Sequence, residues 1–256
     1  MTTSVVSPAA RIAYPLLRCS AALDAASDEA IRAICAASTT LHVAPGRDIS
    51  AEAGSQDGLF IVVRGKVKLA WRCAGGDRLV GLLGPGDSFG EWDLLDPEPQ
   101  PMAALAVGPA VVLAVDADLL RAAVTERPEL GLCLLRLLAR RLRLAHALVA
   151  DCMFDDAGVR VAKHLLVLGR RFGVVSGGGR TLVRHDLTQT ELAQLIGISR
   201  ESVNRILHSF AARGWIRVLP KALVIERPDL LARRAGRAPA AAAKVFQVPR
   251  TRAGVH

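Results

Sequence analysis

The segment LTQTELAQLIGISRESVNRILHSF, residues 187–210, decides the fold of the C-terminal part of the chain. Its apolar and small residues fit two short helices that cross at a tight turn. Thr188 precedes the first helix and Glu191 follows three residues later, which is the spacing of a capping box. Gly197 supplies the permissive backbone of the turn, and Ser199 can cap the second helix. This pattern is typical of a helix-turn-helix that binds DNA.

The second helix of this segment has an apolar side and a polar side. The apolar residues recur at three- and four-residue spacing and are expected to face the core. They are Val203, Ile206, Leu207 and Phe210. The polar residues of the opposite side are Arg200, Glu201, Asn204 and Arg205. Arginine can donate two hydrogen bonds to guanine and glutamate can accept one from cytosine, so this side is predicted to read a G·C-containing site in the major groove. The alternative is a pair of ordinary surface helices whose charges form solvated ion pairs.

Length, composition and charge agree with a globular protein that binds a polyanion. The chain has 256 residues and 51% hydrophobic content, which excludes a mostly disordered protein. Residues 1–120 hold 9 Lys and Arg against 14 Asp and Glu, whereas residues 121–256 hold 24 against 10. The C-terminal half is therefore expected to attract a phosphate backbone. By itself this charge would equally suit RNA or a membrane surface.

The sequence contains no apparent membrane or metal-binding signal. No apolar run approaches the roughly 20 residues that cross a bilayer, and no basic flank and apolar core mark a signal peptide, so we expect a cytoplasmic protein without a membrane partner. The cysteines show no C-x-x-C motif and no histidine at metal-site spacing. We expect no metal site and reduced thiols, and a redox role for an exposed thiol stays open. The cysteines are Cys19, Cys35, Cys73, Cys133 and Cys152.

Residues 43–115 consist of short β-branched runs between glycine-containing turns. Regular short strands at this spacing predict a rolled antiparallel sheet or a small barrel. Within it, residues 59–63 and 66–71 flank Arg64-Gly65, which we interpret as a hairpin.

A long helix is predicted from Pro128 to about Cys152. One apolar stripe follows the alternating three- and four-residue spacing of a coiled-coil seam. It consists of Leu135, Leu138, Leu142, Ala145, Val149 and Cys152. A second stripe is expected to pack on the β region, and its residues are Leu130, Leu134, Leu137, Leu144 and Leu148. Burying both stripes requires a partner, most simply a second copy, although a helix buried within one subunit is the alternative.

A further helix is predicted at residues 156–168, followed by the loop GRRFGVVSGGGR at residues 169–180. After the helix-turn-helix, WIRV at residues 215–218 and ALVIE at residues 222–226 predict a two-stranded wing. The fold class is therefore α+β. The expected parts are a leader (1–19), a β-roll (20–127), a dimerisation helix (128–154), a winged helix-turn-helix (155–231) and a disordered basic tail (232–256).

This order of parts resembles the Crp/Fnr family of bacterial transcription regulators over residues 20–232. The segment ISRESVNRIL, residues 198–207, is similar to the recognition helix of the cyclic-AMP receptor branch. The resemblance places Arg200, Glu201 and Arg205 at base-reading positions and Thr188 at a phosphate contact. It implies a homodimer that regulates transcription by reading an inverted repeat with TGTGA-like half-sites. The full set of expected DNA contacts is Thr188, Gln189, Ser199, Arg200, Glu201, Asn204 and Arg205.

Two of these expected contacts depart from the family pattern. Gln189 stands where the family often has arginine, which would weaken one backbone contact, and Asn204 would alter the preference at one base. RNA polymerase is a candidate protein partner through the loop at residues 169–180.

On the ligand side, LLGPGDSFGEWDLL at residues 82–95 resembles the phosphate-binding cassette of the family, with Gly90 and Glu91 on its Gly-Glu pair. Cyclic-nucleotide binders then carry Arg-Ser about eleven residues after the glycine, and this chain has Pro101 and Met102. Without the guanidinium, a buried cyclic phosphate would lose its counter-charge, at a cost of several kcal/mol by order of magnitude.

The long helix shows a second departure from cyclic-nucleotide binders. Ala145 and His146 replace the hydroxyl pair that this helix offers to the adenine base. We therefore predict that cyclic AMP binds weakly or not at all. A different nucleotide, an acyl ligand or activity without an effector stay open.

Other chemistries are less well supported by the sequence. Cys19 and Cys35 alone do not supply the ligands of an iron-sulfur cluster. His42 and His146 are candidate haem ligands, but a lone histidine is more often an ordinary structural or surface residue. No nucleophile elbow, Walker loop, dinucleotide fingerprint or metal-binding helix is present, so we do not expect an enzyme. A regulatory subunit that uses only the β-roll to act on a protein partner is the alternative function, and it leaves the basic recognition helix unexplained.

Overall fold

The structure is a computed structural model. It describes Tyr14, Leu17, Arg18, Ser20, Leu23 and residues 26–36, 38–54, 58–96, 98 and 101–236. Two compact units are distinguished along the chain. The first comprises the described residues of Met1–Ala74 and Leu82–Ala139, and the second those of Gly75–Gly81 and Arg140–Phe246. Most of the expected leader lies outside the described residues.

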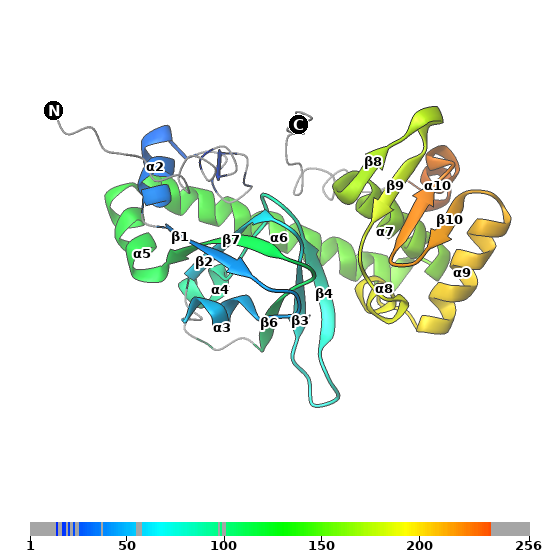
Figure 1. Cartoon of the computed structure of the whole chain (residues 1–256), viewed down its shortest axis with the longest axis horizontal. Coiled ribbons are helices and arrows are strands. Elements are labelled where there is room, and N and C mark those ends of the chain that lie inside the picture. The colour runs from blue at the N-terminus through cyan, green and yellow to red at the C-terminus, as the bar shows by residue number, and fades with distance from the viewer. Residues whose placement is uncertain are drawn as a thin grey trace. The chain divides into compact units, whose positions relative to one another are not determined.

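Two antiparallel sheets form the β-roll (Figure 1). The first has the order β1-β7-β2-β5, with bounds Ser38–Val43, Ala110–Asp116, Gly58–Arg64 and Ser88–Phe89. The second has the order β4-β3-β6, with bounds Arg78–Leu83, Val67–Trp71 and Met102–Ala106. This confirms the predicted rolled sheet and, with the helices below, the α+β class.

The hairpin predicted around Arg64-Gly65 is wrong. β2 pairs with β7 and β5, whereas β3 pairs with β6 in the other sheet, so the chain changes sheets at this turn. Gly65 permits the change because its φ is 84° and a Cβ here would lie 2.6 Å from the carbonyl oxygen of Pro109. The partner of β2 is thus a strand distant in sequence, which a local pattern does not reveal.

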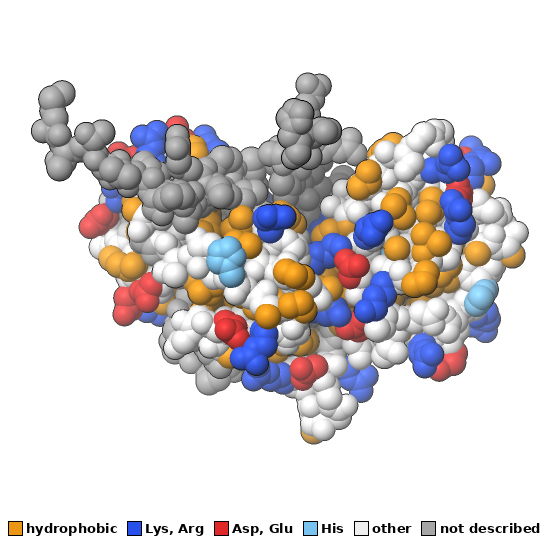
Figure 2. All heavy atoms as spheres, in the orientation of Figure 1, with side chains coloured by type: hydrophobic (Ala, Val, Ile, Leu, Met, Phe, Trp, Pro, Cys, Tyr) orange, Lys and Arg blue, Asp and Glu red, His pale blue; other side chains and the backbone are white. Residues whose placement is uncertain are grey.

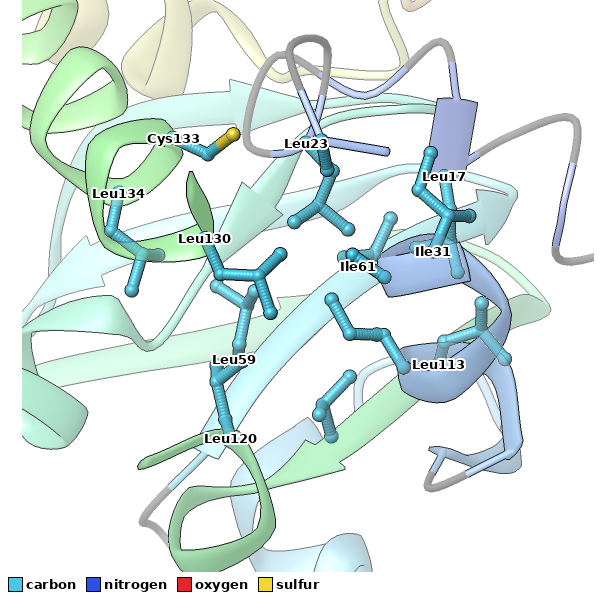
Figure 3. Packing of buried hydrophobic residues seen from close by; sticks show 14 of the residues in the cluster. Leu17, Leu23, Ile31, Leu59, Ile61, Leu113, Leu120, Leu130, Cys133 and Leu134 are labelled. Carbon is cyan, nitrogen blue, oxygen red and sulfur yellow. The ribbon is translucent and has the colours of Figure 1, made fainter. Parts of the chain in front are cut away.

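Both faces of β2 are buried, and this explains its uninterrupted apolar run. Leu59 and Ile61 face a core that they share with helices (Figure 3). The intervening Phe60 and Val62 face a second core, where the Phe60 ring stacks on Phe89 with centroids 5.0 Å apart. Because successive side chains of a strand point to opposite faces, one strand contributes to two cores.

Short helices flank the sheets of the first unit. They are α2 (Asp28–Ala36), α3 (Ile49–Ala53), α4 (Glu91–Leu95) and α5 (Ala117–Glu126). The Asp116 carboxylate caps α5 by accepting hydrogen bonds from the backbone N–H groups of Asp118 and Leu119.

The long helix α6 (Pro128–Phe154) confirms the prediction of its position. Its N-terminal part packs in the core through Leu130, Leu134 and Leu137. In the expected continuation of this stripe Leu144 is half-buried, and the prediction is wrong at Leu148, which is 46% exposed. The reason is that the core of the first unit ends before that turn, since the helix residues in its cluster stop at Leu137.

The second unit is a winged helix-turn-helix (Figure 1). Its helices are α7 (Ala157–Phe172), α8 (Gln189–Ile196), α9 (Arg200–Ala212) and α10 (Pro228–Ala235). Its sheet has the order β10-β11-β9-β8, with bounds Ile216–Leu219, Ala222–Ile225, Thr181–Arg184 and Gly173–Val175. The predicted two-stranded wing is present as β10 and β11.

Two expected boundaries differ from the structure. Residues 169–172 of the expected loop are the last turn of α7, and Gly173–Val175 is a strand. The expected tail begins later than residue 232, because α10 continues to Ala235 and buries Leu231 and Ala235. Those two residues are four apart and form one apolar face. The rest of the expected tail lies outside the described residues.

No helix among the described residues has the length and apolar character that crossing a membrane requires. Among the described residues Cys35 and Cys133 are buried, Cys73 and Cys152 are exposed, and none of the four forms a disulfide, whereas Cys19 lies outside the described residues.

Candidate nucleic-acid interface

The first helix of the motif, α8, begins at the predicted capping box. The backbone N–H of Glu191 donates to Thr188 Oγ1 at 3.2 Å, and the backbone N–H of Thr188 donates to Glu191 Oε2 at 2.7 Å. Both orphan donors of the helix start are thereby satisfied. The threonine hydroxyl also donates to the same carboxylate oxygen at 2.9 Å. Thr188 and Gln189 are exposed at this end of the helix.

The turn between the two helices depends on Gly197. Its φ of 74° lies in the left-handed region, which glycine adopts without a steric penalty. Its N–H donates to the carbonyl oxygens of Ala193 and Gln194 and so closes the end of α8. Ile198 then donates to the carbonyl of Ala193 at 3.1 Å.

The recognition helix α9 begins after Ser199, whose hydroxyl oxygen accepts a hydrogen bond from the backbone N–H of Ser202 at 3.1 Å. Val203, Leu207 and Phe210 are buried, as their spacing predicts, whereas Ile206 of the same predicted side is half-buried. The Phe210 ring lies 5.1 Å from that of Trp215 at the start of the wing, so the helix and the wing share one core. These contacts hold α9 firmly while its other side faces outward.

The outward side of α9 carries most of the predicted base-reading residues. Arg200, Glu201 and Arg205 are exposed, and within the described part of the chain none of them forms an ion pair. The alternative of mutually paired surface charges is therefore not what the structure shows. Asn204 differs from the expectation, since it is half-buried and its amide oxygen is enclosed. It lies one residue from buried Val203, toward the packed side of the helix.

The wing holds a cation that the sequence patterns above do not single out. Lys221 follows Pro220 in the two-residue turn between β10 and β11, and it is exposed. Its φ is 53°, a conformation that non-glycine residues rarely adopt. Asp186, with φ of 59°, donates its backbone N–H to the Lys221 carbonyl at 2.8 Å. Proline is favoured at the first central position of short turns, so Pro220 marked a turn that would expose the next residue.

Basic side chains are spread over the face of the second unit seen in Figure 2. Lys221 and the arginines of α9 are exposed cations of this unit. Such charges suit contacts with DNA phosphates.

The expected dimer stripe of α6 is largely uncovered. Leu135, Leu142 and Val149 are 63%, 57% and 56% exposed. Ala145 and Cys152 are also exposed, whereas Leu138 is half-buried. A run of large apolar side chains on one helix is unusual at a free surface and indicates a protein contact.

The cassette of the first unit keeps its backbone. Gly90 has a φ of 86°, and a Cβ there would lie 2.3 Å from the carbonyl oxygen of Gly58 and 2.8 Å from the Phe60 ring. Glycine is therefore required for both the turn and the close approach to β2. Glu91 follows as the first residue of α4, and its side chain is buried. Pro101 is exposed and Met102, the first residue of β6, is half-buried. On α6, which belongs in this part to the second unit, Ala145 and His146 are both exposed.

Comparison with known proteins decides the family. The profile of the Crp-like helix-turn-helix domain matches residues 159–234, and that of the cyclic nucleotide-binding domain matches residues 40–127. The CRP-like cAMP-activated global transcriptional regulator of Mycobacterium tuberculosis is 45% identical over 191 residues, which cover 74% of this chain and 85% of that protein. The chain belongs to the Crp/Fnr family of transcriptional regulators.

Further relatives agree with this assignment. The cyclic AMP receptor protein of Thermus thermophilus is 37% identical over 187 residues, which cover 73% of this chain and 83% of that protein. The solved structure of FixK2 from Bradyrhizobium japonicum has a TM-score of 0.66 and 21% identity, covering 78% of this chain and 98% of that one. At this identity the likeness concerns the fold alone. This Crp/Fnr member is thus a transcriptional regulator with a helix-turn-helix DNA-binding domain.

The cassette of this Crp/Fnr member does not fit a cyclic nucleotide at two positions. Pro101 has no backbone N–H to donate, and its carbonyl oxygen already accepts from the Arg72 backbone at 2.6 Å. Met102 offers only a thioether, which is a weak acceptor. Neither side chain can neutralise a phosphate. The fold of the ligand domain is therefore present without the positive charge that the family's phosphate-binding cassette would place here.

Proposed function

We propose that this protein is a homodimeric regulator that reads an inverted repeat through α9, with half-sites similar to TGTGA. The observation that carries the proposal is the outward side of α9, where Arg200, Glu201 and Arg205 are exposed without ion pairs among the described residues. Two arginines can each recognise a guanine, and the glutamate can accept from the amino group of a cytosine. A site containing several G·C pairs matches this set of donors and acceptors.

The proposed homodimer is supported by the apolar stripe of α6. Leu135, Leu142 and Val149 are seven residues apart, and each is more than half exposed in the single chain. A seven-residue repeat is the period at which two helices keep the same side toward each other. Two copies joined along this stripe would present two recognition helices to the two halves of a palindrome.

We further propose that the effector, where one acts, is not cyclic AMP. The absence of a guanidinium at Pro101 supports this, because a cyclic phosphate enclosed by the cassette would keep an unneutralised charge. The Mycobacterium tuberculosis relative is named as a cAMP-activated regulator. Because of Pro101 and Met102, we expect this chain to respond to a different ligand or to none.

RNA polymerase is the proposed protein partner, through the segment between α7 and β9. Val174 and Val175 of β8 are 67% and 58% exposed, and the adjoining Gly177–Gly179 turn is exposed as well. An apolar edge strand beside a glycine-rich turn offers both side chains and backbone groups to another protein.

The test is a selection of preferred duplexes from a random pool with the full-length protein. It is run without ligand and with a panel of nucleotides that includes cyclic AMP. We expect an enriched inverted repeat whose enrichment does not depend on cyclic AMP. Enrichment of a single, non-repeated motif would contradict the dimeric reading, and no enriched sequence at all would contradict the base-reading role of α9.

A further inference from the structure

The corner between α6 and α7 contains a cation that is enclosed by two carboxylates. Lys163, in the middle of α7, places its Nζ 2.6 Å from Asp151 Oδ1 and 2.5 Å from Asp155 Oδ2. Asp151 belongs to the last turns of α6, and Asp155 follows the end of that helix. The three side chains are only 13%, 16% and 24% exposed. One ammonium therefore joins the end of the long helix to the first helix of the DNA-binding unit.

These ion pairs differ from the solvated pairs elsewhere on the surface. Exposed pairs contribute little, but removing one member of an enclosed group leaves its partners without a counter-charge. Burial by itself would lower the pKa of Lys163, yet the hydrogen bonds and negative charges of Asp151 and Asp155 outweigh it and raise that pKa. The ammonium is thus charged at every physiological pH, so the connection does not open by loss of its proton.

A second connection starts three residues earlier on the same helix. Arg160 Nη1 lies 3.4 Å from Cys152 Sγ on α6 and donates to the carbonyl oxygen of Gly197 at 3.3 Å. Gly197 is the turn residue of the helix-turn-helix. The end of α6, the helix α7 and the turn before the recognition helix are therefore linked through one arginine.

The start of α7 is also connected. The Asp156 carboxylate caps the helix by accepting from the Val159 backbone at 3.0 Å, and it accepts from Arg234 Nη2 of α10 at 2.6 Å. All of these contacts lie within the second unit. The junction between α6 and α7 is thus held by side-chain contacts to both helices. A junction without such contacts would be expected to be flexible.

We propose that Lys163 is a positioning residue, which fixes the last turns of the dimer helix to the DNA-binding domain and so sets the spacing of the two recognition helices. The inference rests on the proposed dimer that reads an inverted repeat. Lys163 itself is not expected to touch DNA or an effector. Its effect should appear only when two half-sites must be bound at one separation.

The experiment uses the full-length protein and the duplex selected by the wild type. Affinity is measured for one half-site alone and for two half-sites whose separation is changed one base pair at a time. Lys163→Met removes the charge at similar length, and Lys163→Arg restores a cation. Arg170→Met removes an exposed cation of the same helix and is the matched control.

We expect Lys163→Met to bind the single half-site within about twofold of the wild type, as a change remote from DNA should. At the best separation of two half-sites we expect a loss of about tenfold and a broader dependence on separation, since a coupling between sites is lost. Lys163→Arg should recover the narrow dependence, and Arg170→Met should behave as the wild type.

Three outcomes would overturn the proposal. An unchanged dependence on separation in Lys163→Met shows that the cation does not set the spacing, and an equal loss on one and two half-sites shows that it only supports the fold. If Lys163→Met does not fold, Asp155→Asn keeps one of the two ion pairs and takes its place, and an unchanged dependence there counts against the proposal in the same way.

Failure of the proposed function gives a different result. In that case the wild type itself shows no gain from a second half-site and no preferred separation. The inference about Lys163 then falls with the dimer on which it rests.

Discussion

The helix-turn-helix of the second unit and the cassette of the first unit both match motifs of one family, but they differ in which side chains they keep. In the first case the caps, the turn glycine and the exposed Arg200, Glu201 and Arg205 are all present. In the second, Gly90 and buried Glu91 remain, whereas Pro101 and Met102 stand where a cyclic phosphate would need a cation and a hydroxyl.

This difference agrees with our proposal that the β-roll keeps its fold while its ligand differs from cyclic AMP. The β-roll is held by apolar packing such as Phe60 on Phe89, and by a glycine whose Cβ would meet backbone. Those constraints are independent of any ligand. In a helix that reads bases, the exposed polar side chains themselves make the contacts with DNA. Changing these side chains therefore changes the DNA site directly.

The largest expected effect concerns the apolar stripe of α6, which is the proposed dimer contact. Leu142→Asp places a carboxylate in the apolar stripe of α6, where a partner helix would bury it without a counter-charge. We expect the dimer dissociation constant to rise roughly a hundredfold or more, measured by sedimentation. Ala150→Asp, on a different side of the same helix, is the control and should leave the dimer intact. A Leu142→Asp protein that remains dimeric would place the interface elsewhere.

The base-reading half of the comparison is tested with Arg205→Ala. Loss of a bidentate contact to guanine should weaken binding to the selected site by about 1–3 kcal/mol and flatten the preference at one base pair, with little change on random DNA. Lys221→Ala removes a cation of the wing instead. It should weaken both kinds of DNA alike and reduce the dependence on salt by about one ion. Competition binding at several salt concentrations measures the affinity of each variant for the selected site and for random DNA. An equal loss of affinity for both kinds of DNA in Arg205→Ala would exclude base reading.

The ligand half is tested by calorimetric titration with cyclic AMP. We expect the wild type to show no micromolar binding, because Pro101 and Met102 cannot neutralise the phosphate. Adding the missing groups in Pro101→Arg/Met102→Ser should improve the affinity about tenfold, which corresponds to about 1.4 kcal/mol. Micromolar binding by the wild type would remove the contrast between the two motifs.

The smallest effect concerns the stability of the second unit in acid. Burial lowers the pKa of His164 below its ordinary value of 6.5, against the opposing effects of the Arg160 carbonyl and Asp151. The unfolded chain therefore takes up a proton at a higher pH than the folded chain. Stability is lost as the pH falls below 6.5 and is unaffected well above it.

His164→Gln should reduce the fall in melting temperature between about pH 7.5 and about pH 5.5, on either side of the ordinary value. His42→Gln changes an exposed histidine of β1 and is the control. An equal fall in His164→Gln and the wild type would mean that other groups cause the acid sensitivity.

The parts predictable from sequence were those whose causes lie close together in the chain. The capping box of Thr188 and Glu191, the left-handed Gly197 and the apolar spacing of α9 each act within one or two helical turns. The long helix and its exposed stripe follow from the same short-range periodicity. The missing phosphate partner at Pro101 stays a prediction from the sequence, which rests on a family motif whose spacing indicates the residue that is replaced.

Tertiary structure decided the rest. Strand β2 pairs with β7 and not with its neighbour β3, Leu148 is exposed because the core ends before it, and the Asn204 amide oxygen is enclosed on a helix whose other polar residues face outward. Lys163 was indistinguishable in sequence from a surface lysine until two carboxylates were found within hydrogen-bonding distance of it. Helical periodicity and capping are set by backbone geometry over a few residues, whereas strand pairing, burial and enclosed ion pairs depend on which distant segments the packing of the core brings together.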